Sequence, residues 1–197
     1  LTEAGFGSDL GAEKFFDIKA RYGELDVAGA VIVATVRSIK HNAGVDKAEL
    51  SDENVAALEE GIVNLERHVE NVRKFGVTPV VALNRFTTDS EAELDFLKNW
   101  AKAKDIALAE ADVWGKGGDG ALELAETLLD NLTEGTSHPL YDPAEGVEAS
   151  IETIAKEIYR AADVQYSAAA LKDLQTLKDN GFDNLPVCIS KTQYSFS

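Results

Sequence analysis

The chain has 197 residues and a formal net charge of −16, with acidic residues spread along its length, so a nucleic-acid partner is disfavoured because phosphate binding needs a basic face. Hydrophobic residues make up 45% of the sequence, enough for a buried core, but no apolar run is long enough to span a bilayer. The single cysteine, Cys188, excludes an internal disulfide and is typical of a reducing compartment. We therefore expect a cytoplasmic protein without a nucleic-acid or membrane partner.

Four short apolar segments are predicted to be strands. The first two, Gly29–Val36 and Val77–Leu83, are continuously apolar and rich in β-branched residues, as is typical of strands buried on both faces. Ile106–Trp114 is a weaker third candidate, and Leu185–Ser190 is the fourth. The glycine-rich opening of the chain is expected to follow one more strand, upstream of Leu1.

Helices are predicted between these strands. Within residues 46–74 the apolar positions recur at spacings of three and four, which indicates a helix with one buried stripe, and acidic or hydroxyl side chains at its start offer caps. Thr88 and Glu91 predict a capping box for the next helix. The remaining predicted helices lie near 122–132, with Asp119 as cap, near 151–158, and from Ser167 to Gly181.

Strands and helices alternate along the chain, which predicts an α/β fold with a mostly parallel sheet flanked by helices. The polar stretch Thr133–Glu148 holds two prolines and is the best candidate for a joint. We predict an α/β portion over 1–132 and a helical excursion over 133–197 that returns to a last strand. A single domain is the alternative.

Parallel sheets bind ligands at the carboxyl ends of their strands. The residues that follow the predicted strands are mostly aromatic, basic or glycine. They are Arg37, Lys40 and His41 after the first strand, Asn84, Arg85 and Phe86 after the second, Trp114, Lys116, Gly117 and Gly118 after the third, and Lys191 after the fourth; Glu3, Gly5, Phe6 and Gly7 belong to the opening loop. This pattern favours a cleft for a flat, anionic ligand.

Each part of this rim also has a purely structural interpretation. The run GKGGDG at 115–120 differs in order from a phosphate-binding loop and is explained equally by entry into a helix, although a helix N-terminus can also hold an anion. Asn84 has two interpretations, as a residue that binds the edge of a nucleotide base or as a residue in a turn. Phe86 and Trp114 are interpreted either as ligand contacts or as core residues. The three histidines are scattered, so no zinc site is predicted. No catalytic residue is assigned.

Five stretches of the sequence resemble successive blocks of the formate–tetrahydrofolate ligase (formyltetrahydrofolate synthetase) family. They are TEAGFGSDLGAEKFFDIKAR, VIVATVRSIKHNAGV, LNRFTTDSEAEL, VWGKGGDGALELA and LPVCISKTQYSFS, and they occur in the family's order over nearly the whole chain. The resemblance implies a fold similar to phosphate-loop NTPases and a homotetramer. It also implies ATP, Mg²⁺ and a monovalent cation as cofactors, with formate activated as formyl phosphate and passed to tetrahydrofolate to give 10-formyltetrahydrofolate.

The resemblance also implies roles for particular residues. Phe86 and Trp114 match the pair that sandwiches the pterin ring, Asn84 lies in the same folate-binding stretch, and the opening loop lines the same cleft. The family's usual proline after the phenylalanine is Thr87 here. Arg37, Lys116, Gly117, Gly118 and Lys191 are candidate anion or nucleotide contacts.

The matched blocks correspond to a later-middle part of a longer enzyme. We therefore expect the N-terminal phosphate-binding loop and the extreme C-terminus to lie outside this chain, and the chain alone to be inactive. Two alternatives are a non-catalytic α/β interaction module and a different nucleotide-dependent α/β enzyme in which Asn84 reads a base.

Overall fold

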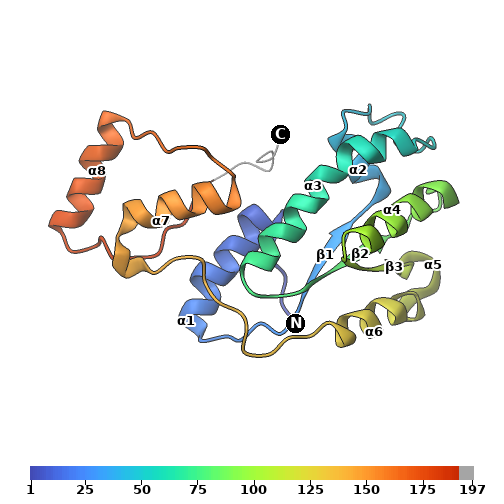
Figure 1. Ribbon diagram of the computed structural model, residues 1–197, viewed down its shortest axis with the longest axis horizontal. Coiled ribbons are helices and arrows are strands. Elements are labelled where there is room, and N and C mark those ends of the chain that lie inside the picture. The colour runs from blue at the N-terminus through green and yellow to red at the C-terminus, as the bar shows by residue number, and fades with distance from the viewer. Residues whose placement is uncertain (191–197) are drawn as a thin grey trace. The chain divides into compact units, whose positions relative to one another are not determined.

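The computed structural model describes residues 1–190, and the chain divides into two compact units, which are described separately below (Figure 1). Among the described residues, one unit is Val27–Thr136, and the other combines Leu1–Asp26 with residues 137–190. Within the described residues, no helix combines the length and the apolar character needed to cross a membrane.

The first unit is built on a three-stranded parallel sheet in the order β1-β2-β3. Its strands are β1 (Ala30–Ala34), β2 (Pro79–Asn84) and β3 (Ala107–Ala111). Val31 lies opposite Val80, which in turn lies opposite Ala107. The predicted α/β fold with a parallel sheet is therefore confirmed. The first three predicted strands are present, with β1 and β3 shorter than predicted and β2 beginning two residues later and ending one residue later.

Helices cover both faces of this sheet. They are α2 (Val36–Asn42), α3 (Val55–Lys74), α4 (Glu91–Ala103), α5 (Val113–Lys116) and α6 (Leu122–Asp130). In Figure 1, α3 and α4 lie on one side of the sheet and α6 lies on the other. The carboxyl ends of the strands lead into α2, α4 and α5.

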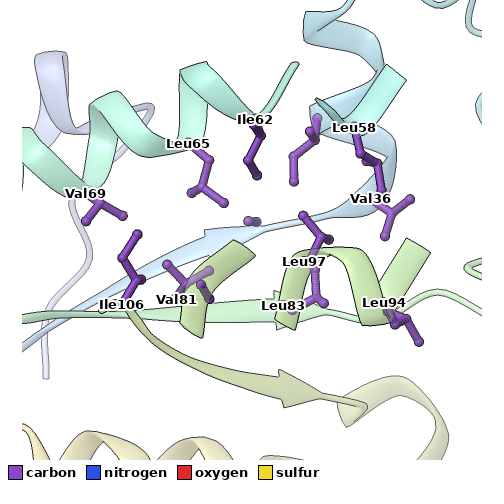
Figure 2. Close-up of a cluster of buried hydrophobic side chains, with 13 residues drawn as sticks. Val36, Leu58, Ile62, Leu65, Val69, Val81, Leu83, Leu94, Leu97 and Ile106 are labelled. Atoms are coloured by element: carbon purple, nitrogen blue, oxygen red, sulfur yellow. The ribbon is translucent and has the colours of Figure 1, made fainter. Parts of the chain in front are cut away.

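The core lies between the sheet and the helices α3 and α4 (Figure 2). The apolar stripe predicted for α3 faces inward and meets side chains from β2 and α4. The core residues include Leu58, Ile62, Leu65 and Val69 from α3, Val81 and Leu83 from β2, and Leu94 and Leu97 from α4. Because β2 is buried along nearly its whole length, this packing holds the ends of all three strands in place.

Two predicted helix starts and one further predicted helix cap are wrong. The helix predicted from residue 46 begins at Val55, because the Asn54 side chain accepts the N–H of Ala57 while residues 46–52 form turns. The predicted Thr88–Glu91 capping box is replaced by Ser90 and Glu93, whose side chains each accept the other's backbone N–H. A turn that closes through residues 86–89 delays the start of α4 by two residues. Asp119 does not cap α6.

The second unit is mainly helical. Helical turns at Ser8–Ala12 and Phe15–Ala20 lead into α1 (Arg21–Gly23); α7 (Val147–Thr153) continues as Ile154–Ile158, and α8 (Ala168–Asp179) follows. The predicted cap of the last helix is confirmed, since the Ala170 N–H donates to Ser167 Oγ at 3.2 Å.

The fourth predicted strand is wrong. Leu185–Ser190 carries no strand, and the sheet of the described residues ends at β3. Pro186 has no N–H to donate, and the N–H of Val187 donates to the Tyr141 hydroxyl at 2.9 Å instead of to a neighbouring strand. Apolar, β-branched composition alone is therefore not sufficient for this segment to form a strand. The predicted site residue Lys191 lies outside the described residues.

Candidate functional site

The carboxyl edge of the sheet carries most of the predicted site residues. After β1 the chain turns at once into α2, because the side chains of Thr35 and Ser38 form a capping box. Arg37, Lys40 and His41 therefore lie on a short helix rather than on an exposed loop. Arg37 is half-buried, whereas His41 is exposed.

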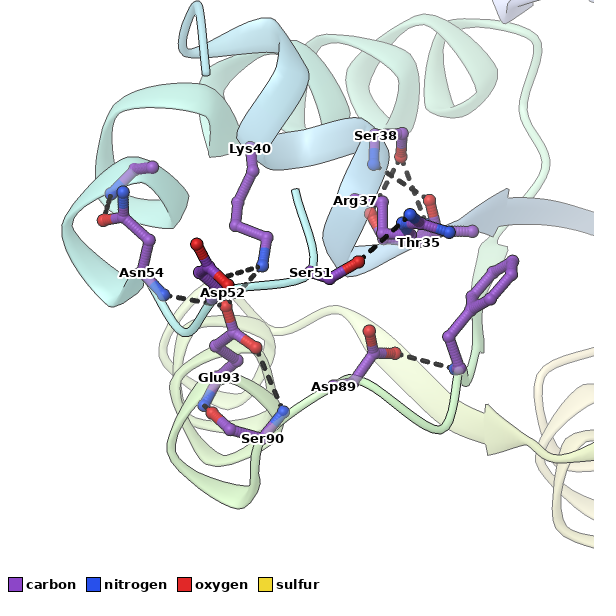
Figure 3. Close-up of polar contacts among 12 residues, drawn as sticks. Thr35, Arg37, Ser38, Lys40, Ser51, Asp52, Asn54, Asp89, Ser90 and Glu93 are labelled. Carbon is purple, nitrogen blue, oxygen red and sulfur yellow. Dashed lines mark hydrogen bonds and ion pairs between the residues drawn. The ribbon is translucent and has the colours of Figure 1, made fainter. Parts of the chain in front are cut away.

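Lys40 is not a rim residue, contrary to the prediction. Its side chain is 1% exposed, and its Nζ lies 2.8 Å from Glu93 Oε1 on α4, which is 0% exposed (Figure 3). The same Nζ donates to the carbonyl of Asp52 at 2.9 Å. The aliphatic stem packs with the core while the ammonium group reaches a buried carboxylate. This ion pair joins segments that follow two neighbouring strands.

Both carboxylate oxygens of Glu93 accept hydrogen bonds. Beyond Lys40, its Oε1 accepts the N–H of Asn54 at 3.0 Å and its Oε2 accepts the N–H of Ser90 at 3.0 Å. Burial alone would raise the pKa of Glu93, but these hydrogen bonds and the Lys40 ammonium outweigh it and hold the pKa below its usual value. The carboxylate is therefore charged and fixes three backbone segments at one point.

Residues 85–90, here called the Phe86 loop, connect β2 to α4. The Arg85 N–H donates to the Ala111 carbonyl at 3.0 Å, which extends the pairing with β3 beyond the strand end. The Phe86 N–H donates to Asp89 Oδ2 at 2.8 Å, and burial raises the pKa of Asp89 despite this bond. The Arg37 guanidinium lies 5.6 Å from the centre of the Phe86 ring, at cation–π distance. Phe86 is thus held while 38% of it remains exposed.

Arg85 and Glu110 link the Phe86 loop to β3 by charge. Arg85 pairs with Glu110 at 3.2 Å and with Glu91 at 2.7 Å, and Lys98 of α4 pairs with Glu110 at 2.5 Å. The pairs made by the exposed Glu91 and Lys98 side chains add little stability, whereas Arg85 and Glu110 are 32% and 17% exposed. Together the pairs with Glu91 and Glu110 occupy the Arg85 guanidinium.

Residues 112–121, here called the Trp114 loop, follow β3. Asp112 accepts the Gly115 N–H at 3.1 Å and caps the single turn of α5, and Lys116 Nζ lies 3.5 Å from Asp112. Trp114 is 90% exposed. Gly117 has φ +58° and ψ −140°, a conformation that is essentially restricted to glycine.

Phe86 and Trp114 thus follow neighbouring strands of one sheet. Asn84, the last residue of β2, pairs with Ala111, the last residue of β3, so each aromatic residue comes two or three positions after a paired strand end. Both side chains are exposed rather than part of the core. This arrangement places two aromatic faces and a half-buried amide at one edge of the sheet.

The opening loop belongs to the other unit. Glu3, Gly5 and Phe6 are exposed and Gly7 is half-buried, and Phe6 has the uncommon positive φ of 61°. A Cβ on Gly11 would lie 2.0 Å from the Gly5 carbonyl oxygen, so the loop folds tightly against the first helical turns.

The same unit contains a buried carboxyl group that the sequence analysis did not single out. Asp17 is 0% exposed, and its Oδ1 accepts the Leu140 N–H at 2.7 Å. Burial raises its pKa to about 6, against the opposing effects of the Leu140 N–H and Arg21.

No clamp for a triphosphate or for Mg²⁺ is formed by the residues that the structure describes. Among residues 1–190 there is no group of three histidine, cysteine or acidic side chains that could hold a metal ion. The glycine-rich Trp114 loop lacks the order of residues in a phosphate-binding loop. Gly118 lies open, with no atom within 4 Å of where a Cβ would stand, so an anion can approach this backbone.

The sequence analysis missed the Lys40–Glu93 pair. A signal existed, because Glu93 stands three residues after Ser90 and so completes a capping box in the printed sequence. Its contact with Lys40 could not be found in this way, since the two residues are 53 positions apart.

Comparison with known proteins reveals extensive similarity. The family model for formate–tetrahydrofolate ligase matches residues 1–197. Curated proteins named formate–tetrahydrofolate ligase match over the whole chain: one from Corynebacterium diphtheriae is 61% identical, one from Corynebacterium jeikeium 54%, and one from Staphylococcus aureus 52%. The chain spans 34–36% of the length of these relatives.

Proposed function

Because the chain belongs to the formate–tetrahydrofolate ligase family, we propose that it forms the tetrahydrofolate-binding portion of a ligase that joins formate to tetrahydrofolate. The observation that carries this proposal is the pair of exposed aromatic side chains, Phe86 and Trp114, after neighbouring parallel strands. Carboxyl ends of parallel strands are where such sheets bind ligands. Exposed aromatic faces at that edge suit a flat heterocycle.

In this proposal Phe86 and Trp114 stack on the pterin ring, and the Asn84 amide meets its polar edge. Stacking of a flat base on an aromatic side chain contributes about 1–3 kcal/mol per residue. Lys116 is two-thirds exposed, and together with the open backbone at Gly118 it is a contact for the ligand's anionic groups. Arg37 already contacts the Phe86 ring and Ser51, so its proposed role is to hold the Phe86 ring in place rather than to bind the ligand.

The proposed reaction follows from the family. ATP phosphorylates formate to give formyl phosphate, and the amine of tetrahydrofolate then attacks the formyl carbon; phosphate leaves and the nitrogen loses a proton, giving 10-formyltetrahydrofolate. Because formyl phosphate is hydrolysed by water, the flat ligand must cover the reacting carbon. ATP, Mg²⁺ and the monovalent cation are proposed to bind in other parts of the enzyme, and the chain alone is proposed to be inactive. A homotetramer is proposed on the family resemblance.

The test is steady-state kinetics of the full-length ligase that contains this chain. Trp114→Ala and Phe86→Ala should each raise the KM for tetrahydrofolate roughly tenfold, since about 1.4 kcal/mol is one decade. The KM for ATP should change little. The matched control is Phe182→Ala, which removes an aromatic ring that is 51% exposed in the other unit.

Three results would count against the proposal. Stable Trp114 and Phe86 variants with an unchanged KM for tetrahydrofolate would exclude the stacking site. An equal rise in the KM for both substrates would indicate general damage rather than loss of a folate contact. Turnover of formate, ATP and tetrahydrofolate by residues 1–197 alone would refute the proposed inactivity of the chain.

A further inference from the structure

We infer that the buried Lys40–Glu93 pair positions Phe86 for the flat ligand, as a device that couples α2 to the Phe86 loop; this inference rests on the proposed function. The pair is fully buried, at 1% and 0% exposure, and its N–O distance is 2.8 Å. Neither side chain reaches the ligand edge, so both are positioning residues rather than catalytic ones.

Stability alone is a weak reason for such a pair. Two buried charges lose their hydration, and neutral side chains of the same volume are often equally or more stable in their place. A buried pair that also organises backbone groups has a geometric consequence that apolar packing does not provide. Glu93 meets Lys40, Asn54 and Ser90 at 2.8–3.0 Å, so it sets the distances between α2, the start of α3 and the start of α4.

The route from this pair to Phe86 is short on both sides. On the α4 side, Ser90 is held by Glu93, and the adjacent Asp89 holds the Phe86 N–H at 2.8 Å. On the α2 side, Lys40 lies one turn after Arg37, whose guanidinium is 5.6 Å from the Phe86 ring centre. Figure 3 shows Lys40 of α2 meeting Glu93 of α4, with Asp89 and Ser90 just before α4 and Arg37 on α2. The pair therefore fixes both the backbone position of Phe86 and the position of the Arg37 guanidinium over the Phe86 ring.

The Arg37 guanidinium is also held by the connection between α2 and α3. Its Nη2 donates to Ser51 Oγ at 3.2 Å, in the connection between α2 and α3, and Lys40 donates to Asp52 in the same connection. A shift of α2 would therefore move the Arg37 guanidinium along the ring. Since small displacements of a positioning contact cost up to about a hundredfold in activity, loss of the pair should raise the KM for tetrahydrofolate.

The experiment uses the full-length ligase with Lys40→Met and Glu93→Gln combined, which replaces the pair by neutral side chains of similar length. We expect a folded enzyme whose KM for tetrahydrofolate rises roughly tenfold, with the KM for ATP unchanged. Added to Phe86→Ala, the same double change should cause no further rise, because both act through one ring.

The matched control is Lys104→Met combined with Glu66→Gln. This pair has an N–O distance of 2.6 Å and joins Lys104, just after α4, to Glu66 of α3, with side chains 49% and 28% exposed. It lies just before β3, at the opposite edge of the sheet. We expect it to leave the KM for tetrahydrofolate unchanged. Arg37→Met is the second variant if the buried double change fails to fold; Arg37 is half-buried, and its loss should raise this KM several-fold.

The outcomes separate this inference from the proposed function. A folded Lys40/Glu93 variant or Arg37→Met enzyme with unchanged KM for tetrahydrofolate overturns the inference alone, provided that Phe86→Ala raises that KM. Full additivity with Phe86→Ala, or the same effect from the Lys104/Glu66 control, also overturns it. If neither Phe86→Ala nor Trp114→Ala alters the KM, the proposed function fails and the inference fails with it.

Discussion

The two loops that carry the aromatic residues differ in how firmly they are held. The Phe86 loop is tied to α2 and β3 by buried charges, a capping box and a backbone hydrogen bond to Ala111. The Trp114 loop is held by contacts within itself, which are the Asp112 cap on the Gly115 N–H and a backbone hydrogen bond from the Asp112 N–H to the Gly120 carbonyl at 3.0 Å. It leaves its tryptophan 90% exposed. If both rings stack on one ligand, Phe86 is a pre-formed face and Trp114 is the face that closes on it, so the cost of ordering on binding falls on Trp114.

We expect the largest effect in the free energy of unfolding, when one variant near the Phe86 loop is compared with one in the Trp114 loop. Glu93→Ala leaves the Lys40 ammonium buried without its carboxylate and should lower the free energy of unfolding by about 3–5 kcal/mol. Trp114→Ala should change it by less than about 0.5 kcal/mol, because the side chain is exposed. Urea unfolding followed by circular dichroism measures both, and similar losses in the two variants would abolish the distinction between a held and an open loop.

A backbone test probes the Trp114 loop itself. Gly117→Ala should cost about 1–3 kcal/mol, because φ +58° with ψ −140° is strained for any residue with a Cβ. Gly118→Ala, one residue later, meets no atom within 4 Å and should be neutral or stabilising by about 0.4–1 kcal/mol. Thermal unfolding of the matched pair checks this, and equal melting temperatures would show that the loop relaxes freely around Gly117.

Helix caps should give a smaller contrast. Ser90→Ala removes the cap of α4 and should cost about 1 kcal/mol of unfolding free energy. Asp112→Ala removes the cap of α5, a single exposed turn, and should cost less than about 0.5 kcal/mol. The two variants are compared by urea unfolding. A larger loss from Asp112→Ala would mean that the Trp114 loop is the better anchored of the two.

The smallest effect concerns pH. The pKa of Glu93 is lowered from 4.5 in the folded protein, so its charge stabilises the fold above pH 4.5, and this contribution is lost as the pH falls through the folded pKa. Glu93→Gln should therefore make the unfolding free energy fall less steeply below pH 4.5, by less than about 1.4 kcal/mol per pH unit. Asp89, whose pKa is raised, contributes with the opposite sign.

The control for the pH measurement is Asp89→Asn. Because the folded state keeps the Asp89 proton to higher pH than the unfolded state does, this residue weakens the fold as the pH rises above 3.8. Its replacement should make the decline on acidification steeper. Parallel pH profiles for wild type and Glu93→Gln would contradict the charged, hydrogen-bonded state assigned to Glu93.

The sequence by itself determined the elements that depend on local periodicity. The continuous apolar runs predicted the strands β1 and β2, but the expected burial on both faces holds only for β2, because Val31 and Val33 of β1 are 40% and 68% exposed. The spacing of Leu58, Ile62, Leu65 and Val69 predicted the buried face of α3. The sequence also placed Phe86 just after a strand end, because the end of that apolar run is visible in the sequence, whereas the third predicted strand extended to Trp114 and in the structure ends at Ala111. The family resemblance likewise needed only the order of the quoted blocks.

Tertiary structure alone decided what depends on distant partners. Leu185–Ser190 has the composition of a strand, but it forms no strand, and its Val187 N–H donates to the Tyr141 hydroxyl. The pairing of Glu93 with Lys40, a residue 53 positions away, likewise appears only in the folded chain. Lys40 itself, which the sequence places at the rim, is buried because a carboxylate on another helix compensates its charge. Burial and ion pairing are properties of the packed chain, which local spacing does not encode.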